Sequence, residues 1–340
     1  GDFFFLDING RVEANFVLPG GFLKLALKGN EEFVGSTIDL SSLRADMRYY
    51  REVGVGFSRN VTDKLRIGVK GKILFGIAAA SIDNQSLGIT VNDDYSHTLD
   101  ADITVNMSGP VDVYMDSGHK IDSIVFDDSR FKTSSGRADF FSGIGNPGFG
   151  LDIGATYDLT EKIVVSAAIT DLGFIRWKKD VTNVKIKNQF EFSGLNMLDV
   201  INGTITIDEL GQEMLDSLKD SFIVTKSNEP FTTYLPFGIS IGGSYNVTSQ
   251  FSVGMLSYSR IIGKQIREAL TFSANINIGN AFSTSFSYTA ANHRYDNFGA
   301  GLAFRTGIVQ FYLLSDRIPI SWNKIKDTNS TIPLPANWNI

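Results

Sequence analysis

The 340-residue chain has no cysteine, and no uninterrupted apolar run in it approaches the length of a membrane-spanning helix. The missing cysteine excludes disulfides, iron–sulfur clusters and thiolate zinc sites, and it suits a chain exported through an oxidising compartment. Helical membrane spans are excluded because they need roughly 18 or more consecutive apolar residues. The amino end has no basic region followed by an apolar core. We therefore expect either that any export signal has been removed or that the sequence begins inside the protein.

Basic residues are also too few and too scattered to form a patch. The chain has 31 lysines and arginines against 37 acidic residues, a net charge of −6. This balance argues against nucleic acid as a partner. The mean hydropathy is close to zero, which is typical of strands with one face toward lipid and the other toward water.

The feature that dominates the sequence is alternation of apolar and polar residues with a period of two. In 46–59 the odd-numbered positions from Met47 to Phe57 are mainly apolar, interrupted only by Arg51, and in 65–77 the even-numbered positions carry lysine and arginine. Such charges would be unfavourable against lipid but are natural on a wet inner face. The same alternation recurs in segments 4–16, 149–159, 163–169, 235–245, 251–255, 270–278, 282–288, 298–304 and 309–313.

These segments predict about eleven strands, many of them long enough to cross the hydrocarbon core at a tilt. A soluble β-sandwich also alternates, but soluble strands average about five or six residues. The polar face here is rich in glycine, serine, threonine and asparagine, and aromatic residues stand at strand ends. We therefore predict an all-β, transmembrane antiparallel barrel with aromatic girdles, formed by residues 1–340 as a single domain.

Connection lengths predict the orientation. Short connections near 60–64, 159–162, 246–250, 278–281 and 305–308 are expected to be periplasmic turns, because outer-membrane barrels place their long loops outside. The long loops are expected at about 16–44, 79–147, 179–230 and 317–340. Within them the pattern predicts helices at 20–29 and 207–221, and segments 87–91 and 99–107 suggest a hairpin extension. Strand direction further predicts that strands are missing at both ends, with about fourteen in the full protein.

Four segments are similar to a Bacteroidetes outer-membrane family of unannotated function within the FadL-like barrel superfamily. They are LKGNEEFVGSTIDLSSL (27–43), YYREVGVGFSRNVTDKLRIGVKGKILFG (49–76), AAITDLGFIRW (167–177) and FYLLSDRI (311–318). The resemblance implies a fourteen-stranded barrel. It also implies uptake of fatty acids or aromatic hydrocarbons, or a non-transporting role in secretion. Asn146-Pro147-Gly148 does not match the transporters' Asn-Pro-Ala signature by position, so no transport residue carries over.

Few motifs suggest other chemistry. Gly143, Gly145 and Gly148 fit the spacing of a dinucleotide loop, but proline and a predicted strand follow them, so we interpret them as the entry to a strand. His97, His119 and His293 are too far apart to suggest a metal site. His293 with Asp296 is the one pair to nominate for hydrolysis, and no serine accompanies it as a nucleophile. Acidic residues of the loop after residue 92 could hold calcium, but without EF-hand spacing a solvated acidic loop is favoured. We expect no enzyme activity, no cofactor and no metal.

The charged residues predicted to line the lumen have two interpretations. They could form an internal salt-bridge network that fills and rigidifies the barrel, which we favour, or a polar wall that orients an amphipathic ligand. Either way they should be paired, because unpaired buried charge is unfavourable. These residues are Arg11, Glu13, Arg48, Glu52, Arg66, Lys70, Lys72, Asp152, Arg260 and Arg305.

The leading functional hypothesis is a FadL-like channel or binding barrel for passive passage of a small hydrophobic or amphipathic molecule. A capture surface is expected on the helix at 20–29, from Phe22, Leu23, Leu25 and Leu27. The alternative is a non-transporting subunit of an outer-membrane secretion or assembly complex that docks partners through its long loops. Expected partners are outer-membrane lipid and lipopolysaccharide, a hydrophobic ligand and other outer-membrane or surface proteins.

Overall fold

A single large antiparallel sheet dominates the structure, a computed structural model that describes residues 2–118, 120–192, 223–279, 281–292, 294–307, 309–315, 322–326 and 331–335. Its main path runs through strands in the order β1-β3-β4-β8-β9-β13-β14-β15-β16-β17-β18. Their bounds are β1 Phe3–Val17, β3 Arg44–Asn60, β4 Leu65–Val91, β8 Pro147–Asp158, β9 Ile163–Trp177, β13 Phe237–Asn246, β14 Phe251–Ile262, β15 Gln265–Ile278, β16 Phe282–Ala291, β17 Arg294–Thr306 and β18 Val309–Ser315. These are the eleven strands that the alternation predicts, and the five expected tight turns fall between them.

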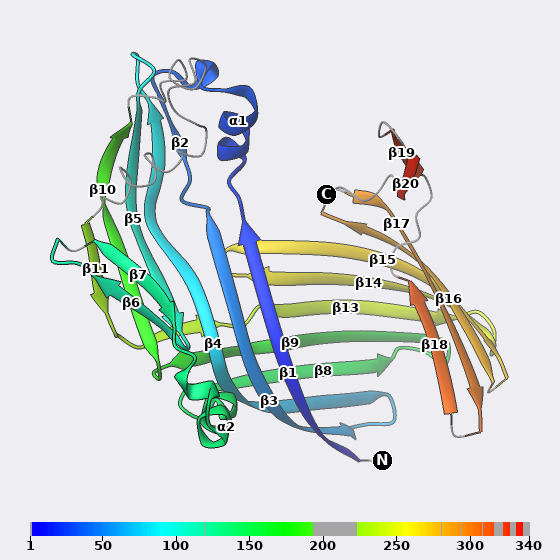
Figure 1. Ribbon diagram of the computed structural model, residues 1–340. Helices are drawn as coiled ribbons and strands as arrows, with labels where there is room; N and C mark the ends of the chain where they lie inside the picture. The colour runs from blue at the N-terminus through cyan, green and yellow to red at the C-terminus, as the bar shows by residue number, and fades with distance from the viewer. Residues whose placement is uncertain are drawn as a thin grey trace.

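The sheet curves into an open trough, with β1 and β18 as its two edges (Figure 1). Within the described residues, β1 pairs with β3 and β18 pairs with β17, and no pairing joins the two edges. The predicted count of fourteen strands stays a prediction. We call the side with the short connections the tight-turn end and the opposite side the long-loop end.

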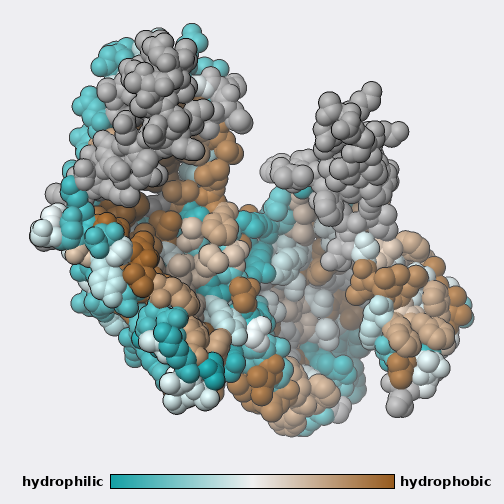
Figure 2. Space-filling model, in the orientation of Figure 1, coloured by the Kyte–Doolittle hydropathy of each residue, from teal (hydrophilic) through white to brown (hydrophobic). Residues whose placement is uncertain are grey.

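The outward face of this sheet exposes large apolar side chains along its whole length. Val12 is 74%, Ile8 70%, Val55 59% and Ile73 56% exposed. Brown, apolar surface gathers along the lower side of the molecule and over the strands at the right in Figure 2, whereas much of the concave face is teal or pale. A water-soluble sheet would bury such a face, and one that spans hydrocarbon presents it to lipid. This confirms the predicted fold class, an antiparallel sheet of the transmembrane β-barrel type.

A second sheet region extends from the long-loop end. The 27-residue strand β4 continues beyond the barrel wall, where it pairs with β2 (Ser36–Asp39) and β5 (His97–Ser108). Then β10 (Val181–Phe192) and β11 (Ile223–Ser227) extend the sheet, and β6 (Val111–Met115) and β7 (Ile121–Phe126) form a separate hairpin. The hairpin predicted at 87–91 and 99–107 is therefore present, as β4 and β5. The sequence did not predict β10 and β11, which lie in the expected loop 179–230.

The remaining elements are short. They are the helices α1 (Gly20–Lys28) and α2 (Ser134–Ser142), the single turns η1 (Glu31–Phe33) and η2 (Ser129–Phe131), and the strands β12 (Phe231–Tyr234), β19 (Trp322–Lys326) and β20 (Thr331–Pro335). The helix expected at 20–29 is confirmed as α1, whereas the one expected at 207–221 lies outside the described residues. Among the helices that the structure describes, none has the length and apolar character to cross a membrane.

A compact apolar core closes the inner face where the barrel wall meets the long loops. Trp177, Tyr50, Leu74 and Ile175 are fully buried there, together with Leu235. The Trp177 ring lies so close to Gly76 that a Cβ at Gly76 would come within 2.6 Å of it. The indole Nε1 donates to Thr233 Oγ1 at 2.9 Å, so the ring is also fixed by a hydrogen bond.

Candidate functional site

Charged side chains of five neighbouring strands meet on the inner face. Arg11 in β1 lies opposite Tyr50 in the register of β1 and β3, and its neighbour Asn9 lies opposite Glu52. Arg11 Nε is 3.0 Å from Glu52 Oε2, and Arg11 Nη1 is 3.2 Å from Asp171 Oδ2. Asn9 Nδ2 donates to Glu52 Oε1 at 3.0 Å. Arg11 thus joins β3 to β9 across the width of the trough.

Two lysines of β4 complete this group. Lys70 Nζ is 2.8 Å from Asp7 Oδ2 and 3.4 Å from Glu52 Oε1. Lys72 Nζ is 2.6 Å from Asp152 Oδ1 and 2.5 Å from Asp171 Oδ1. Lysines two residues apart share one face of a strand. Because both point inward, each can bridge two carboxylates.

Asp171 occupies a break in the pairing of β8 and β9. The register jumps between Leu151 and Ile153, and Asp171 has a left-handed backbone with φ +62°. Its amide donates to Asp152 Oδ1 at 2.6 Å. Asp171 is not among the predicted lumen residues, although the sequence holds a signal for it: the outward apolar positions shift from odd numbers up to Ile169 to even numbers from Leu172. Such a phase shift is typical of a β-bulge.

A second group of charges lies nearer the long-loop end. Arg48 Nε is 3.4 Å from Glu13 Oε2, and Arg260 Nη2 is 3.9 Å from Glu13 Oε1. The Tyr50 hydroxyl donates to Glu13 Oε1 at 3.1 Å. Arg48 Nη1 also donates to the Tyr234 carbonyl at 2.6 Å. This group therefore ties β1, β3 and β14 to β12.

Taken together, the two groups contain equal numbers of basic and acidic residues, so the deeply buried members have partners of opposite charge. Glu52 is fully buried and Lys72 is 1% exposed. A buried charge is tolerated only when it is paired and hydrogen-bonded. The basic members are Arg11, Arg48, Lys70, Lys72 and Arg260, and the acidic members are Asp7, Glu13, Glu52, Asp152 and Asp171.

Two of the predicted lumen residues lie away from these groups. Arg66 Nε donates to Asn60 Oδ1 at 2.7 Å, and Arg305 Nη2 donates to Gln310 Oε1 at 2.9 Å. Both are exposed beside tight turns rather than deep in the trough. The structure therefore brings together eight of the ten predicted residues, along with Asp7 and Asp171, which the prediction lacked.

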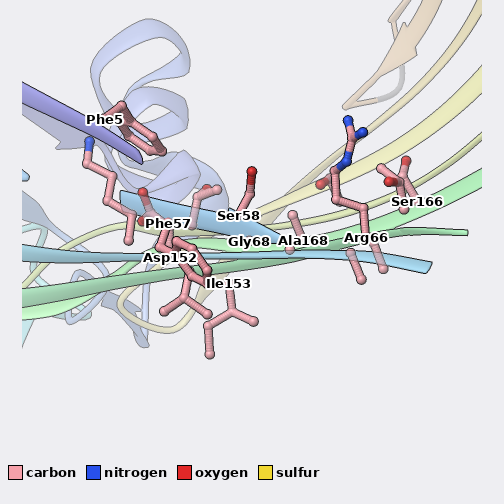
Figure 3. A pocket seen from close by; sticks show the side chains of 17 residues that line it. Phe5, Phe57, Ser58, Arg66, Gly68, Asp152, Ile153, Ser166 and Ala168 are labelled. Atoms are coloured by element: carbon pink, nitrogen blue, oxygen red, sulfur yellow. The ribbon is translucent and has the colours of Figure 1, made fainter. Parts of the chain in front are cut away.

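Next to the first charged group lies an inner-face groove with a volume of about 360 Å³. Phe5 stands at one end of it, and Arg66 and Ser166 lie toward the other, above the strands (Figure 3). Ile153, in contrast, points to the opposite side of the sheet. The lining residues are Phe5, Phe57, Ser58, Arg66, Gly68, Val69, Lys70, Asp152, Ile153, Gly154, Ala155, Thr156, Ser166, Ala167, Ala168, Thr170 and Ser240.

The floor of this groove is one transverse row of small residues. In the register of β3, β4, β8, β9 and β13, Ser58 pairs with Gly68, Gly68 with Gly154, Gly154 with Ala168, and Ala168 with Ser240. No residue of the row is larger than serine. Neighbouring strands lie about 4.8 Å apart, so the row spans roughly 20 Å. The flanking rows carry larger polar groups, with Lys70 opposite Asp152 on one side and Arg66 opposite Thr156 on the other.

The predicted capture helix lies at the other end of β1. In α1, Phe22 is 40% and Leu23 is 44% exposed, and Leu25 is half-buried. The side chain of Leu27 lies outside the described residues. Phe5 and the groove belong to the tight-turn half of the trough, whereas α1 follows the long-loop end of β1 (Figure 1). Among the described side chains, none of those in α1 lines the groove.

The other motifs take structural roles. Gly143 ends α2 with φ +64°, and β8 begins at Pro147, so the glycine-rich stretch leads into a strand as predicted. His97 begins β5, and His119 and His293 lie outside the described residues. Among the described ranges, no three acidic or histidine side chains are arranged to hold a metal ion.

The fold and its inner face define a protein class: an antiparallel transmembrane β-barrel wall with internally paired charges. More specifically, the chain belongs to the family described as "Family of unknown function (DUF5723)", whose model matches residues 1–316. A search of curated proteins found no significant match.

Among solved structures, the chain is similar to two toluene transporters. The TM-score to TbuX of Ralstonia pickettii is 0.38 at 10% identity, covering 91% of this chain and 72% of that one. For TodX of Pseudomonas putida the TM-score is 0.36 at 10% identity, covering 88% and 69%. The ferric-catecholate import receptor Fiu of E. coli K12 gives 0.31 at 10% identity, covering 93% and 55%. Structural similarity at these TM-scores does not indicate which ligand this chain binds.

Proposed function

We propose that this protein is an outer-membrane barrel that passes a small hydrophobic or amphipathic molecule by passive diffusion. The observation that carries the proposal is the row of small residues from Ser58 through Gly154 to Ser240. A row of side chains no larger than serine, flanked by rows with larger polar groups, leaves a groove on the inner face of the wall. An apolar ligand body fits the small row, and a polar end fits the flanking charges.

The pairing of the charged groups supports a binding wall rather than a free ionic pore. Lys70 and Asp152 border the groove, and both are already engaged with partners on neighbouring strands. A ligand therefore meets neutralised ion pairs, which favour a weakly polar or amphipathic molecule over a bare ion. The exposed Phe22 and Leu23 of α1 then serve as a capture surface before the ligand enters the trough. In this arrangement the long-loop end is extracellular, the tight turns are periplasmic and the outward face contacts outer-membrane lipid and lipopolysaccharide.

The test compares two alanine-to-phenylalanine substitutions, one on each face of the wall. Ala168 lies in the floor of the groove, while Ala14 of β1 is an exposed residue of the outward face, between Val12 and Phe16, and does not line the groove. Ala168→Phe should fill the groove and abolish uptake of a hydrophobic fluorescent probe such as N-phenylnaphthylamine into proteoliposomes. Ala14→Phe adds the same bulk toward lipid and should leave uptake unchanged. Equal uptake by both variants and the wild type would contradict the proposal.

A second candidate function is that of a non-transporting subunit that docks other surface proteins. It is favoured by the buried core around Trp177, which packs on the inner face where the wall meets the long loops, and by the second sheet region beyond it. Purification from native membranes under mild detergent separates the two functions. Stoichiometric partners on the long-loop end, with no uptake by proteoliposomes, would support docking and exclude passage.

A further inference from the structure

The segment from Phe126 to Asn146, which we call the foot, packs against the outward face of the sheet. It contains η2, α2 and the loop that leads into β8. Gly143 lies so close to Phe75 of β4 that an added Cβ would fall 2.8 Å from the Phe75 backbone. Phe75 has the outward orientation of Ile73, two residues earlier in the same strand. The foot is therefore on the lipid side of the wall, at the long-loop end (Figure 1).

Asn146 ties the foot to β4, to β5 and to the connection between β9 and β10. Its Oδ1 accepts from the amides of Lys178 and Lys179, both at 2.8 Å. Its Nδ2 donates to the Gly76 carbonyl at 3.2 Å and to Ser108 Oγ at 3.3 Å. The side chain is 4% exposed. A buried side-chain amide whose donors and acceptors are all paired is held in one orientation. These hydrogen bonds therefore fix the position of the foot relative to β4 and β5.

The foot presents an aromatic and apolar surface continuous with the lipid-facing strands. Phe131 stacks on Phe126 at 5.7 Å and meets the edge of Phe140 at 5.2 Å, and Phe141 lies 5.1 Å from Phe140. Phe126 is 59% and Ile144 is 70% exposed. Only four residues separate Ile144 from Phe149, an outward residue of β8 that is 50% exposed.

Charged groups surround this apolar surface. Lys132 Nζ is 3.0 Å from Asp128 Oδ1, and Lys179 Nζ is 2.5 Å from Asp139 Oδ2. Arg130 pairs with Asp180, and Arg137 donates to Ser134 Oγ at 3.2 Å and to a backbone carbonyl. Segments at a membrane–water interface typically combine aromatic residues, which face the apolar side, with charged residues, which face water.

We propose that the foot is a membrane-interface element whose partner is the lipid surface, with Ile144 and the phenylalanine cluster at the boundary of headgroups and acyl chains. Continuity with the lipid-facing strands selects lipid over a protein partner, because hydrocarbon already covers the surface from Phe149 onward. The foot then sets how deep the barrel wall sits at the long-loop end. This inference concerns the outer face and is independent of what the groove carries.

The chain's lack of cysteine allows a direct test. Ile144→Cys in the full chain, labelled with an environment-sensitive fluorophore, is reconstituted in phosphatidylcholine vesicles. Brominated phosphatidylcholine then quenches labels in contact with lipid. Val55→Cys, on the outward face of β3, is the membrane control, and Tyr95→Cys, an exposed residue of the β4–β5 turn, is the aqueous control.

Ile144→Cys should lose emission, and more with bromines near the headgroup than with bromines near the chain end. Val55→Cys should be quenched strongly, which also establishes insertion, and Tyr95→Cys should keep its emission. Phe126→Cys provides a second site on the foot, and it should behave as Ile144→Cys does. If both foot labels keep their emission as Tyr95→Cys does while Val55→Cys is quenched, the foot stands in water and the inference is overturned.

Discussion

Lys72 Nζ lies 2.5 Å from Asp171 Oδ1 and joins the inner face of β4 to the irregular segment of β9. The lysine is 1% exposed, and it also contacts Asp152 at 2.6 Å. One ammonium group therefore neutralises two carboxylates from different strands. The β-bulge places Asp171 beside Lys72, and the ion pair with Lys72 in turn stabilises the bulge.

Lys72→Met should destabilise the barrel wall strongly. The methionine fills a similar volume, but Asp152 loses its ammonium partner and Asp171 keeps only Arg11. Removing one partner of a buried ion pair costs roughly 3–5 kcal/mol. The measurement is the urea concentration at which the detergent-folded protein loses its heat-modifiable migration on a gel. Lys64→Met, in the exposed turn before β4, is the matched control and should have no measurable effect.

The left-handed backbone at Asp171 predicts a graded series of substitutions. Asn tolerates φ of +62° as Asp does, whereas a β-branched residue is strained there. Asp171→Val should therefore be less stable than Asp171→Asn by roughly 1–3 kcal/mol, although both lose the carboxylate. Unfolding in urea measures the difference, and equal stability would show that the bulge does not require this conformation.

Asn146→Ala should loosen the foot without unfolding the wall. The substitution removes four hydrogen bonds, two donated and two accepted. Trypsin should then cut faster at Arg130, Lys132 and Arg137. Asn60→Ala is the control. Asn60 ends β3 at the tight-turn end, far from the foot, so this variant should be cut at these sites no faster than the wild type. Unchanged cleavage in Asn146→Ala would show that the foot is held by its aromatic contacts alone.

Acidification should weaken one of the contacts that hold α2. Lys179 donates a hydrogen bond to Asp139 and holds the pKa of that carboxyl below its ordinary value. A lowered pKa in the folded state contributes stability above the ordinary value, and it is lost as pH falls through the folded pKa. Protease access to α2 should therefore rise below about pH 4. Pepsin cleavage followed across this range is the measurement.

Asp139→Asn is the control for this pH dependence, because it cannot titrate. Its cleavage should vary less with pH than that of the wild type. Some dependence should persist, since hydrogen bonds from Ser129 also lower the pKa of Asp127 in the preceding turn. Identical pH profiles for the wild type and Asp139→Asn would show that titration of Asp139 does not contribute to the pH dependence.

Period-two alternation was sufficient to predict the strands and the inward position of Lys70 and Lys72. Alternation assigns faces wherever one face meets lipid, because a shift by one residue would place charges in hydrocarbon. It failed at Asp171, where a bulge changes the phase. It also could not find α2, whose adjacent Phe140 and Phe141 have no helical spacing, or Asn146, whose partners are far away in sequence.

The small-residue row was equally hidden in the sequence. Ser58, Gly68, Gly154, Ala168 and Ser240 are unremarkable one at a time, and they form a groove only when the strand registers align them. Register over long loops depends on pairings that no local pattern specifies. The charges were therefore predictable residue by residue, whereas the groove required the three-dimensional sheet.

The most direct test of the central claim is a density map of the protein extracted from native membranes. Passage of a hydrophobic molecule along the inner face predicts elongated non-protein density over the row from Ser58 to Ser240, with its polar end near Lys70 or Arg66. The same density should be absent from Ala168→Phe and present in Ala14→Phe. A groove filled by the protein's own side chains, or density unaffected by Ala168→Phe, would contradict the account.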